Sequence, residues 1–182
     1  MSTKKLSKRD ATTDIKDNEV SLAEDDFIIS KTDIKGNILY CNEMFSKISG
    51  YEASSLIGAN HNLIRHPDMP KLSFKILWDL IKNKQEFFGF VKNLIKDGSY
   101  YWVFAYITPD IDDNGNIISY TSVRRKATKS AIDTIIPIYK LLLEAEKSGG
   151  VEASSKVLNE YLKEKKISYD EFIINLQKGA AK

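Results

Sequence analysis

Residues 87–126 read FFGFVKNLIKDGSYYWVFAYITPDIDDNGNIISYTSVRRK, three apolar runs separated by two polar turn sequences. The runs are rich in β-branched and aromatic residues, which favour strands, and they span residues 87–95, 100–109 and 117–126. The turns contain Asp97-Gly98 and Asn114-Gly115, and such pairs are typical of tight connections between antiparallel strands. This stretch therefore predicts three consecutive antiparallel strands.

The chain before this stretch begins with a predicted hairpin. Residues 27–33 and 38–41 are strand-like runs joined by a polar turn. Asn42 is a typical helix N-cap and Gly50 a typical C-terminal stop, so we expect a short helix between them. A second short helical stretch follows at residues 53–57.

A longer helix is predicted from Lys71 to Asn83, where apolar residues recur at three- and four-residue spacing. Along residues 27–126 the predicted elements are then two strands, three helices and three strands. This order predicts an α+β fold, a five-stranded antiparallel sheet with short helices on one face.

The C-terminal part has the spacing of helices. Pro137 lies inside the first of them and is expected to kink or break it, and Gly149-Gly150 should end it before two further helices. Its apolar stripe consists of Ile132, Ile135, Ile136 and Tyr139. Such a stripe needs a surface to cover it, either on the same domain or on a partner or second copy, and the sequence does not choose between them. We divide the chain into a flexible N-terminal arm (1–25), a central domain (26–128) and a helical C-terminal extension (130–182).

Composition restricts the function classes. The 182 residues carry a net charge of +2, without the basic stripe of a nucleic-acid-binding protein, and Arg124-Arg125 is interpreted as a strand end. Cys41 is the single cysteine, which excludes an internal disulfide and a thiolate-rich metal site. No apolar run approaches the ~18 residues that span a bilayer, and the N-terminus is polar. We expect a cytoplasmic protein without direct membrane insertion.

Both histidines fall within one segment, His61-Asn62-Leu63-Ile64-Arg65-His66-Pro67-Asp68-Met69-Pro70. Its imidazole, guanidinium and amide groups can donate to phosphate oxygens and ring carbonyls. The alternative is a helix-capping loop in which Asp68 accepts from the free amides of the next helix. The segment alone leaves both interpretations open.

Three signatures together resemble a PAS sensor domain over residues 27–128. They are NEMF, SGY and LIG between residues 42 and 58, DGSYYWV at 97–103, and the histidine segment. General PAS domains do not carry the histidine segment. Because of it, the sequence resembles the bacterial aerotaxis and energy-taxis (Aer-type) PAS family, whose members bind FAD. The resemblance implies that the central domain is a PAS sensor domain.

The resemblance makes His61, Arg65, His66 and Asp68 candidates for binding the cofactor. Arg65 can pair bidentately with phosphate oxygens or reach a ring carbonyl. His66 can stack or donate, and its charge could change near neutral pH. Asp68 has the alternative roles of ordering Arg65 or capping the helix.

Further candidates lie on the long helix and the third strand. Phe87 stands where this family usually has a Trp, so it keeps an aromatic face but loses the indole N–H. Asn93 is placed to bind a flavin edge or to serve as a strand-end amide. Trp78 and Trp102 either contact the ring or belong to the core. Non-covalent binding is expected, because Gly58-Ala59-Asn60 is followed by His61 rather than by the cysteine of light-sensing flavin domains.

The resemblance implies a redox sensor without catalytic residues or a metal site, not an enzyme. It would signal the redox state of FAD to a membrane-bound chemoreceptor-type transducer, with a homodimer possible. The chain resembles the stand-alone PAS half of a bipartite energy-taxis receptor (CetB-like), or a fragment of a longer receptor. The alternatives are a haem-binding PAS domain, for which the long helix lacks the proximal histidine, and a cofactor-free interaction module.

Overall fold

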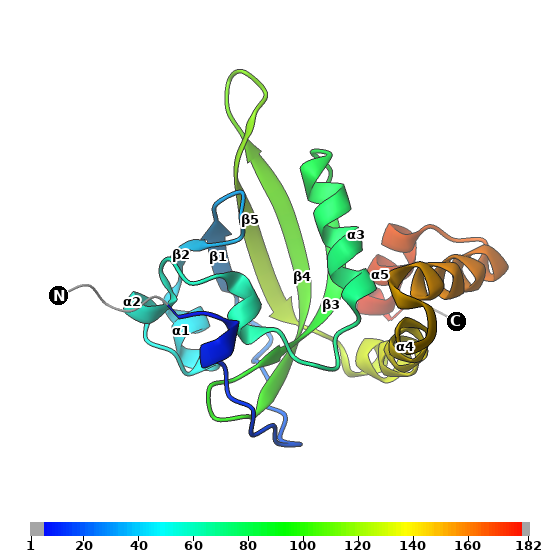
Figure 1. Cartoon of the computed structure of the whole chain (residues 1–182), viewed down its shortest axis with the longest axis horizontal. Helices are drawn as coiled ribbons and strands as arrows, with labels where there is room; N and C mark the ends of the chain where they lie inside the picture. The colour runs from blue at the N-terminus through cyan, green and yellow to red at the C-terminus, as the bar shows by residue number, and fades with distance from the viewer. Residues whose placement is uncertain (1–5, 180–182) are drawn as a thin grey trace.

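One antiparallel sheet of five strands, in the order β2-β1-β5-β4-β3, forms the centre of the molecule (Figure 1). The strands are β1 (Ile28–Thr32), β2 (Ile38–Cys41), β3 (Phe87–Leu94), β4 (Tyr100–Ile111) and β5 (Ile117–Lys126). The computed structural model describes residues 6–179. The predicted strands and their antiparallel pairing are confirmed.

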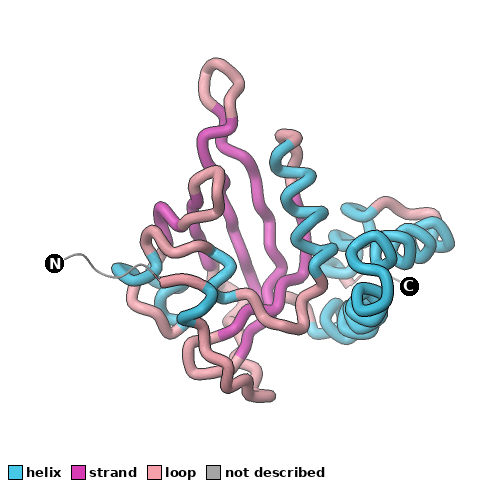
Figure 2. Tube along the Cα trace, viewed as in Figure 1, coloured by secondary structure: helices cyan, strands magenta, loops and turns pink. Residues whose placement is uncertain are grey.

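The helices follow the predicted order, as the tube in Figure 2 shows. They are α1 (Glu43–Ser49), α2 (Ala53–Leu56), α3 (Lys71–Lys82), α4 (Lys129–Lys165) and α5 (Tyr169–Lys178), with short 3-10 turns η1 (Lys8–Asp10) and η2 (His61–Ile64). Asn42 caps α1 as expected: its Oδ1 accepts from the Phe45 amide at 3.1 Å. Gly50 ends α1 with a φ of 73°, a conformation that glycine adopts without strain.

The two faces of the sheet are covered differently because side chains alternate along each strand. One face carries Tyr101, Val103 and Ala105 of β4, which pack with α1, α2 and η2. The opposite face carries Phe90 and Trp102, which pack with the C-terminal helices. The predicted α+β fold, with short helices on one face and a helical extension, is confirmed.

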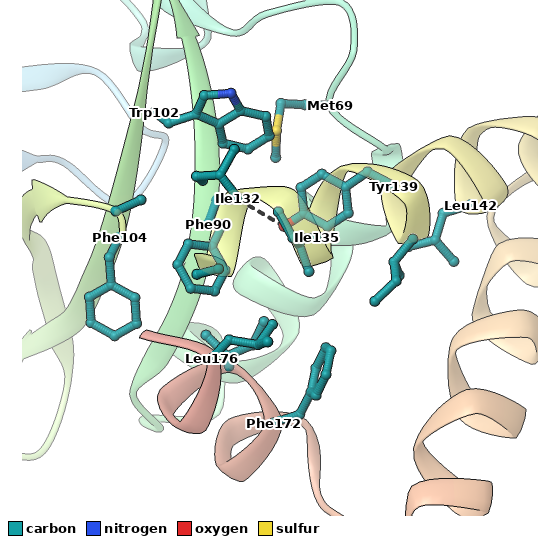
Figure 3. Packing of buried hydrophobic residues seen from close by; sticks show 14 of the residues in the cluster. Met69, Phe90, Trp102, Phe104, Ile132, Ile135, Tyr139, Leu142, Phe172 and Leu176 are labelled. Atoms are coloured by element: carbon teal, nitrogen blue, oxygen red, sulfur yellow. Dashed lines mark hydrogen bonds between the residues drawn. The ribbon is translucent and has the colours of Figure 1, made fainter. Parts of the chain in front are cut away.

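The C-terminal helices bury their apolar stripe on this molecule (Figure 3). The Tyr139 hydroxyl donates to the Phe90 carbonyl oxygen at 2.8 Å, and Ile135 is 1% exposed. Gly149 and Gly150 interrupt α4 as expected, with non-helical dihedral angles. Of the kink or break expected at Pro137, the break is wrong: α4 continues through it, and the packing of its neighbours on the core offsets the lost backbone hydrogen bond.

The part of the N-terminal arm that the structure describes lies against the domain. The amides of Lys16 and Val20 donate to the carbonyls of Gly98 and Tyr100 at 2.9 and 2.8 Å, and Leu22 is buried with the α1 cluster. The predicted flexibility of residues 1–25 is not tested by these contacts, and residues 1–5 lie outside the described part. Within residues 6–179, no helix combines the length and apolarity needed to cross a membrane.

Candidate functional site

A cavity of about 260 Å³ lies between the α1–α3 face of the sheet and the segments η2 and α3. The β1, β3, β4 and β5 strands form its floor, and α3 forms one wall. Its apolar lining comes from Phe74, Leu77, Trp78, Ile81, Val91, Ala105 and Ile107, and its polar lining from Thr32, Asn60, His61, Asn62, Arg65, Asn93, Tyr120, Ser122 and Arg124. An apolar cavity with a few convergent polar groups is typical of a small-molecule site.

The segment η2 is held in place by local hydrogen bonds at its start. Asn60 Oδ1 accepts from the Asn62 amide at 3.2 Å, and Asn60 Nδ2 donates to the Lys35 carbonyl at 3.0 Å. At its far end, the Lys8 ammonium of the arm donates to the Arg65 carbonyl at 2.5 Å. These bonds fix the direction in which His61 and Arg65 leave the backbone.

His61 belongs to a polar network at the floor of the cavity. Its Nε2 lies 3.1 Å from Arg124 Nη1 and 3.3 Å from Ser30 Oγ, and Arg124 Nη2 donates to Ser30 Oγ at 2.6 Å. Because arginine only donates, Nε2 of His61 is the acceptor and the ring is neutral. Burial and the Arg124 charge lower the pKa of His61 to about 3, which agrees with that assignment.

Three polar atoms of the lining are buried and lack a hydrogen-bond partner in the described part of the chain. They are Nδ2 of Asn93, Oγ of Ser122 and Nε of Arg124. Buried polar groups are normally paired, since an unpaired one costs about 1–3 kcal/mol. Such groups beside an apolar wall are typical of a cavity that binds a ligand with both apolar and polar atoms.

Arg65 lies at the margin of the cavity and is half-buried. Its guanidinium lies 3.9 Å from the centre of the Phe74 ring, and Nη2 donates to the Met69 carbonyl at 3.2 Å. A short backbone bridge pairs Arg65 with Asn93, so η2 and β3 hold these two candidates side by side. Met69 supplies the hydrogen-bond acceptor found for this guanidinium among residues 6–179, and the charge that acts on it is the Glu146 carboxylate.

His66 and Asp68 do not line the cavity. His66 is 2% exposed and packs edge-on against Tyr100, and its Nδ1 accepts from the Asp68 amide at 3.1 Å. Burial, followed by the Lys92 charge, lowers the pKa of His66 to about 4, which does not favour the expected change of charge near neutral pH. Asp68 accepts from Lys92 Nζ at 2.7 Å. It does not cap α3, as the alternative interpretation held, because Glu146 takes that place.

The aromatic candidates separate by face. Trp78 lines the cavity and meets Tyr120 edge-on, with ring centres 5.7 Å apart. Phe87 is buried beside Leu77 and outside the cavity lining. Trp102 lies on the opposite face and belongs to the core under α4 (Figure 3).

Sequence reasoning missed Arg124. Arg124-Arg125 lies at the end of β5, as interpreted, but the first side chain is 2% exposed whereas the second is exposed. The strand period contained the signal: Tyr120, Ser122 and Arg124 share one face of β5, so an inward Tyr120 places Arg124 inward as well. Ser122 and Tyr120 were missed for the same reason.

Comparison with known proteins supports this fold. Residues 38–124 match the PAS fold family. The aerotaxis receptor of Escherichia coli (strain K12) is 40% identical over 121 residues, which are 66% of this chain and 24% of that receptor. A nitrogen fixation regulatory protein of Klebsiella oxytoca is 29% identical over 102 residues, which are 56% of this chain and 21% of that protein. The chain therefore spans no more than a quarter of the length of these relatives.

Solved structures show the same architecture. The dark structure of the blue-light photoreceptor Aureochrome1 LOV has a TM-score of 0.53 at 20% identity and covers 66% of this chain and 84% of that one. A Light-Oxygen-Voltage domain studied with a flavin analogue has a TM-score of 0.51 at 23% identity and covers 67% and 86%. At these identities the likeness shows the fold alone. The central part of this chain, with its cavity between sheet and helices, has the PAS fold.

Proposed function

We propose that the protein is a non-enzymatic redox sensor that binds FAD non-covalently in the cavity. The observation that carries the proposal is the pairing of apolar walls with unpartnered buried donors on Asn93 and Arg124. An isoalloxazine ring presents the matching surface, apolar faces with carbonyls and ring nitrogens along one edge. The similarity to the aerotaxis receptor supports a sensory role.

FAD rather than FMN is proposed because of the charge at the cavity margin. A cavity of about 260 Å³ is near the lower limit of the ~300–1,000 Å³ common for ligand sites, so it suits a ring system rather than a whole dinucleotide. The remainder of FAD would then lie at the margin, beside the side-chain donors of Arg65 and Asn62. Arg65 suits a pyrophosphate because its donors pair bidentately with phosphate oxygens.

The proposed output is a signal to a membrane-bound chemoreceptor-type transducer. Reduction changes the charge on the flavin, and a two-state element that contacts the cavity can respond to that change. We propose a stand-alone cytoplasmic partner of the transducer, as in a bipartite receptor, with a fragment of a longer receptor or a homodimer as alternatives. Sensing without catalysis is consistent with a buried His61 whose Nε2 accepts from Arg124 and whose pKa is lowered to about 3 by burial and by the Arg124 charge.

The test is an absorption spectrum of the purified protein, before and after reduction, with identification of the ligand that heat releases. We expect flavin bands that bleach on reduction, and FAD in the supernatant. Arg65→Ala should weaken FAD binding tenfold or more, because a hydrogen bond to a charged group contributes about 1.5–3 kcal/mol and ~1.4 kcal/mol is tenfold in affinity. Arg125→Ala, an exposed change on the same sheet, should leave it unchanged.

Three results would contradict the proposal. A Soret band would favour a haem-binding PAS domain. A colourless protein that cannot be loaded with FAD would favour a cofactor-free interaction module. Equal FAD retention by wild type and Arg65→Ala would remove Arg65 from the site.

A further inference from the structure

The first turn of α3 lies between the cavity and the C-terminal extension. On the cavity side, the Arg65 guanidinium lies 3.9 Å from the centre of the Phe74 ring and donates to the Met69 carbonyl at 3.2 Å. On the other side, the side chains of Met69 and Leu72 are 2% and 3% exposed and pack in the core with α4. This turn therefore contacts both a candidate ligand-binding residue and the extension.

Glu146 of α4 brings a negative charge to this turn. Its carboxylate oxygens accept from the amides of Lys71 and Leu72 at 3.0 and 2.8 Å. The Oγ atom of Ser154, which is 0% exposed, lies 3.4 Å from the same carboxylate. Ser154 belongs to the part of α4 that follows the interruption at Gly149 and Gly150. Glu146 therefore joins the start of α3 to both parts of α4.

The charge of Glu146 also acts on Arg65. Burial lowers the pKa of the Arg65 guanidinium, and the Glu146 charge raises it against that effect. The two side chains bond to neighbouring backbone groups, Arg65 to the Met69 carbonyl and Glu146 to the next two amides but one. Glu146 thus stabilises the cation, and it repels any anion that approaches the same guanidinium.

We propose that Glu146 competes with the anionic part of the ligand for Arg65, so that ligand binding and the attachment of Glu146 to α3 weaken each other. This inference rests on the proposed function, in which the pyrophosphate of FAD lies beside Arg65. A second negative charge at this turn repels the Glu146 carboxylate, and the coupling between the two anions is reciprocal. The C-terminal extension is then held less firmly on α3 when a phosphate-bearing ligand is bound.

The test compares FAD with riboflavin, which has the same ring system and no phosphate, on the flavin-free full-length protein. Glu146→Gln removes the charge and keeps an oxygen that can accept from the α3 amides. The ratio of FAD affinity to riboflavin affinity should rise about two- to fivefold, the order of effect of one partly exposed charge interaction. Glu144→Gln is the matched control, because Glu144 lies on the same helix in an exposed ion pair with Lys147, and it should not change the ratio.

The double variant shows whether the effect depends on Arg65. In the Arg65→Ala protein, adding Glu146→Gln should leave the ratio of FAD to riboflavin affinity where Arg65→Ala alone places it. A ratio in Glu146→Gln equal to or below that of wild type would overturn the inference, and so would a rise of the same size with and without Arg65. Either result would leave Glu146 a structural residue at the start of α3.

Amide hydrogen exchange measures the reciprocal effect. In the wild type, the Lys71 and Leu72 amides should exchange faster in the FAD complex than in the riboflavin complex, by a factor comparable to the change in affinity ratio. Glu146→Gln should remove this difference. Equal or slower exchange in the FAD complex of the wild type would contradict the coupling. Failure of the wild type to bind either flavin would instead overturn the proposed function, and this inference with it.

Discussion

At the level of single residues, His61 and His66 have different surroundings but share a lowered pKa. Desolvation is the largest cause for both, and each also feels a cation, Arg124 for His61 and Lys92 for His66. The folded pKa values of about 3 and about 4 lie below the ordinary value of 6.5. Protonation of either ring is thus coupled to unfolding.

This coupling predicts an acid-sensitive stability. Below pH ~6.5 both histidines bind protons in the unfolded chain but stay neutral in the folded chain. The free energy of unfolding should therefore fall as the pH drops from 6.5 towards 4. The slope is at most ~1.4 kcal/mol per pH unit for each histidine. His61→Gln should reduce that slope in urea titrations between pH 4.5 and 6.5. Asp68, whose folded pKa is lowered by Lys92 against the effect of burial, loses its contribution only at lower pH. Identical slopes for wild type and His61→Gln would show that His61 is protonated in the folded protein.

At the level of elements, the N-terminus of α3 is completed by a residue far away in the chain. Pro70 precedes α3 and offers no side-chain cap. Glu146 of α4 supplies one: its carboxylate oxygens accept from the Lys71 and Leu72 amides at 3.0 and 2.8 Å. A carboxylate is favourable there because the helix dipole is positive at that end. Since α3 lines the cavity, these two hydrogen bonds of Glu146, here called the Glu146 cap, link the C-terminal extension to the site.

Removing the Glu146 cap should lower the free energy of unfolding by about 0.5–2 kcal/mol, the usual effect of losing a helix cap. Glu146→Ala tests this in urea denaturation. Glu144→Ala is the matched control, because Glu144 lies on the same helix in an exposed ion pair with Lys147 and should change stability by less than ~0.5 kcal/mol. Equal effects of the two substitutions would contradict a capping role for Glu146.

The Glu146 cap shows why the helices and strands could be predicted from the sequence, whereas the candidate site could be predicted only in part. Strands and helices follow from local patterns, such as the Asp97-Gly98 turn or the Asn42 cap, and these were predicted correctly. The bonds of Glu146 span 74 and 75 residues, and Arg124 meets His61 across 63 residues. No local pattern encodes such pairs. His61, Arg65, Trp78 and Asn93 line the cavity, whereas the partner that fixes His61 became visible only in the fold.

At the level of the whole molecule, the C-terminal extension is part of the core. Figure 3 shows α4 and α5 packed over Phe90, Trp102 and Phe104, on the face of the sheet opposite to the cavity. Burying each such side chain contributes about 1.5–3 kcal/mol. The apolar stripe of α4 is therefore occupied within the chain, and a transducer would have to dock on another surface or displace these helices.

Two leucine-sized side chains on α4 provide the test of this packing. Ile135 is 1% exposed against the sheet, and Leu141 is 61% exposed. Ile135→Ala should lower the free energy of unfolding by about 2–5 kcal/mol, because it removes buried methylene groups and leaves a cavity. Leu141→Ala should change it by less than ~0.5 kcal/mol, because its side chain already faces solvent. Urea denaturation of both full-length variants gives the comparison. If Ile135→Ala were as stable as Leu141→Ala, α4 would not be packed on the sheet in solution, and its stripe would be free for a partner.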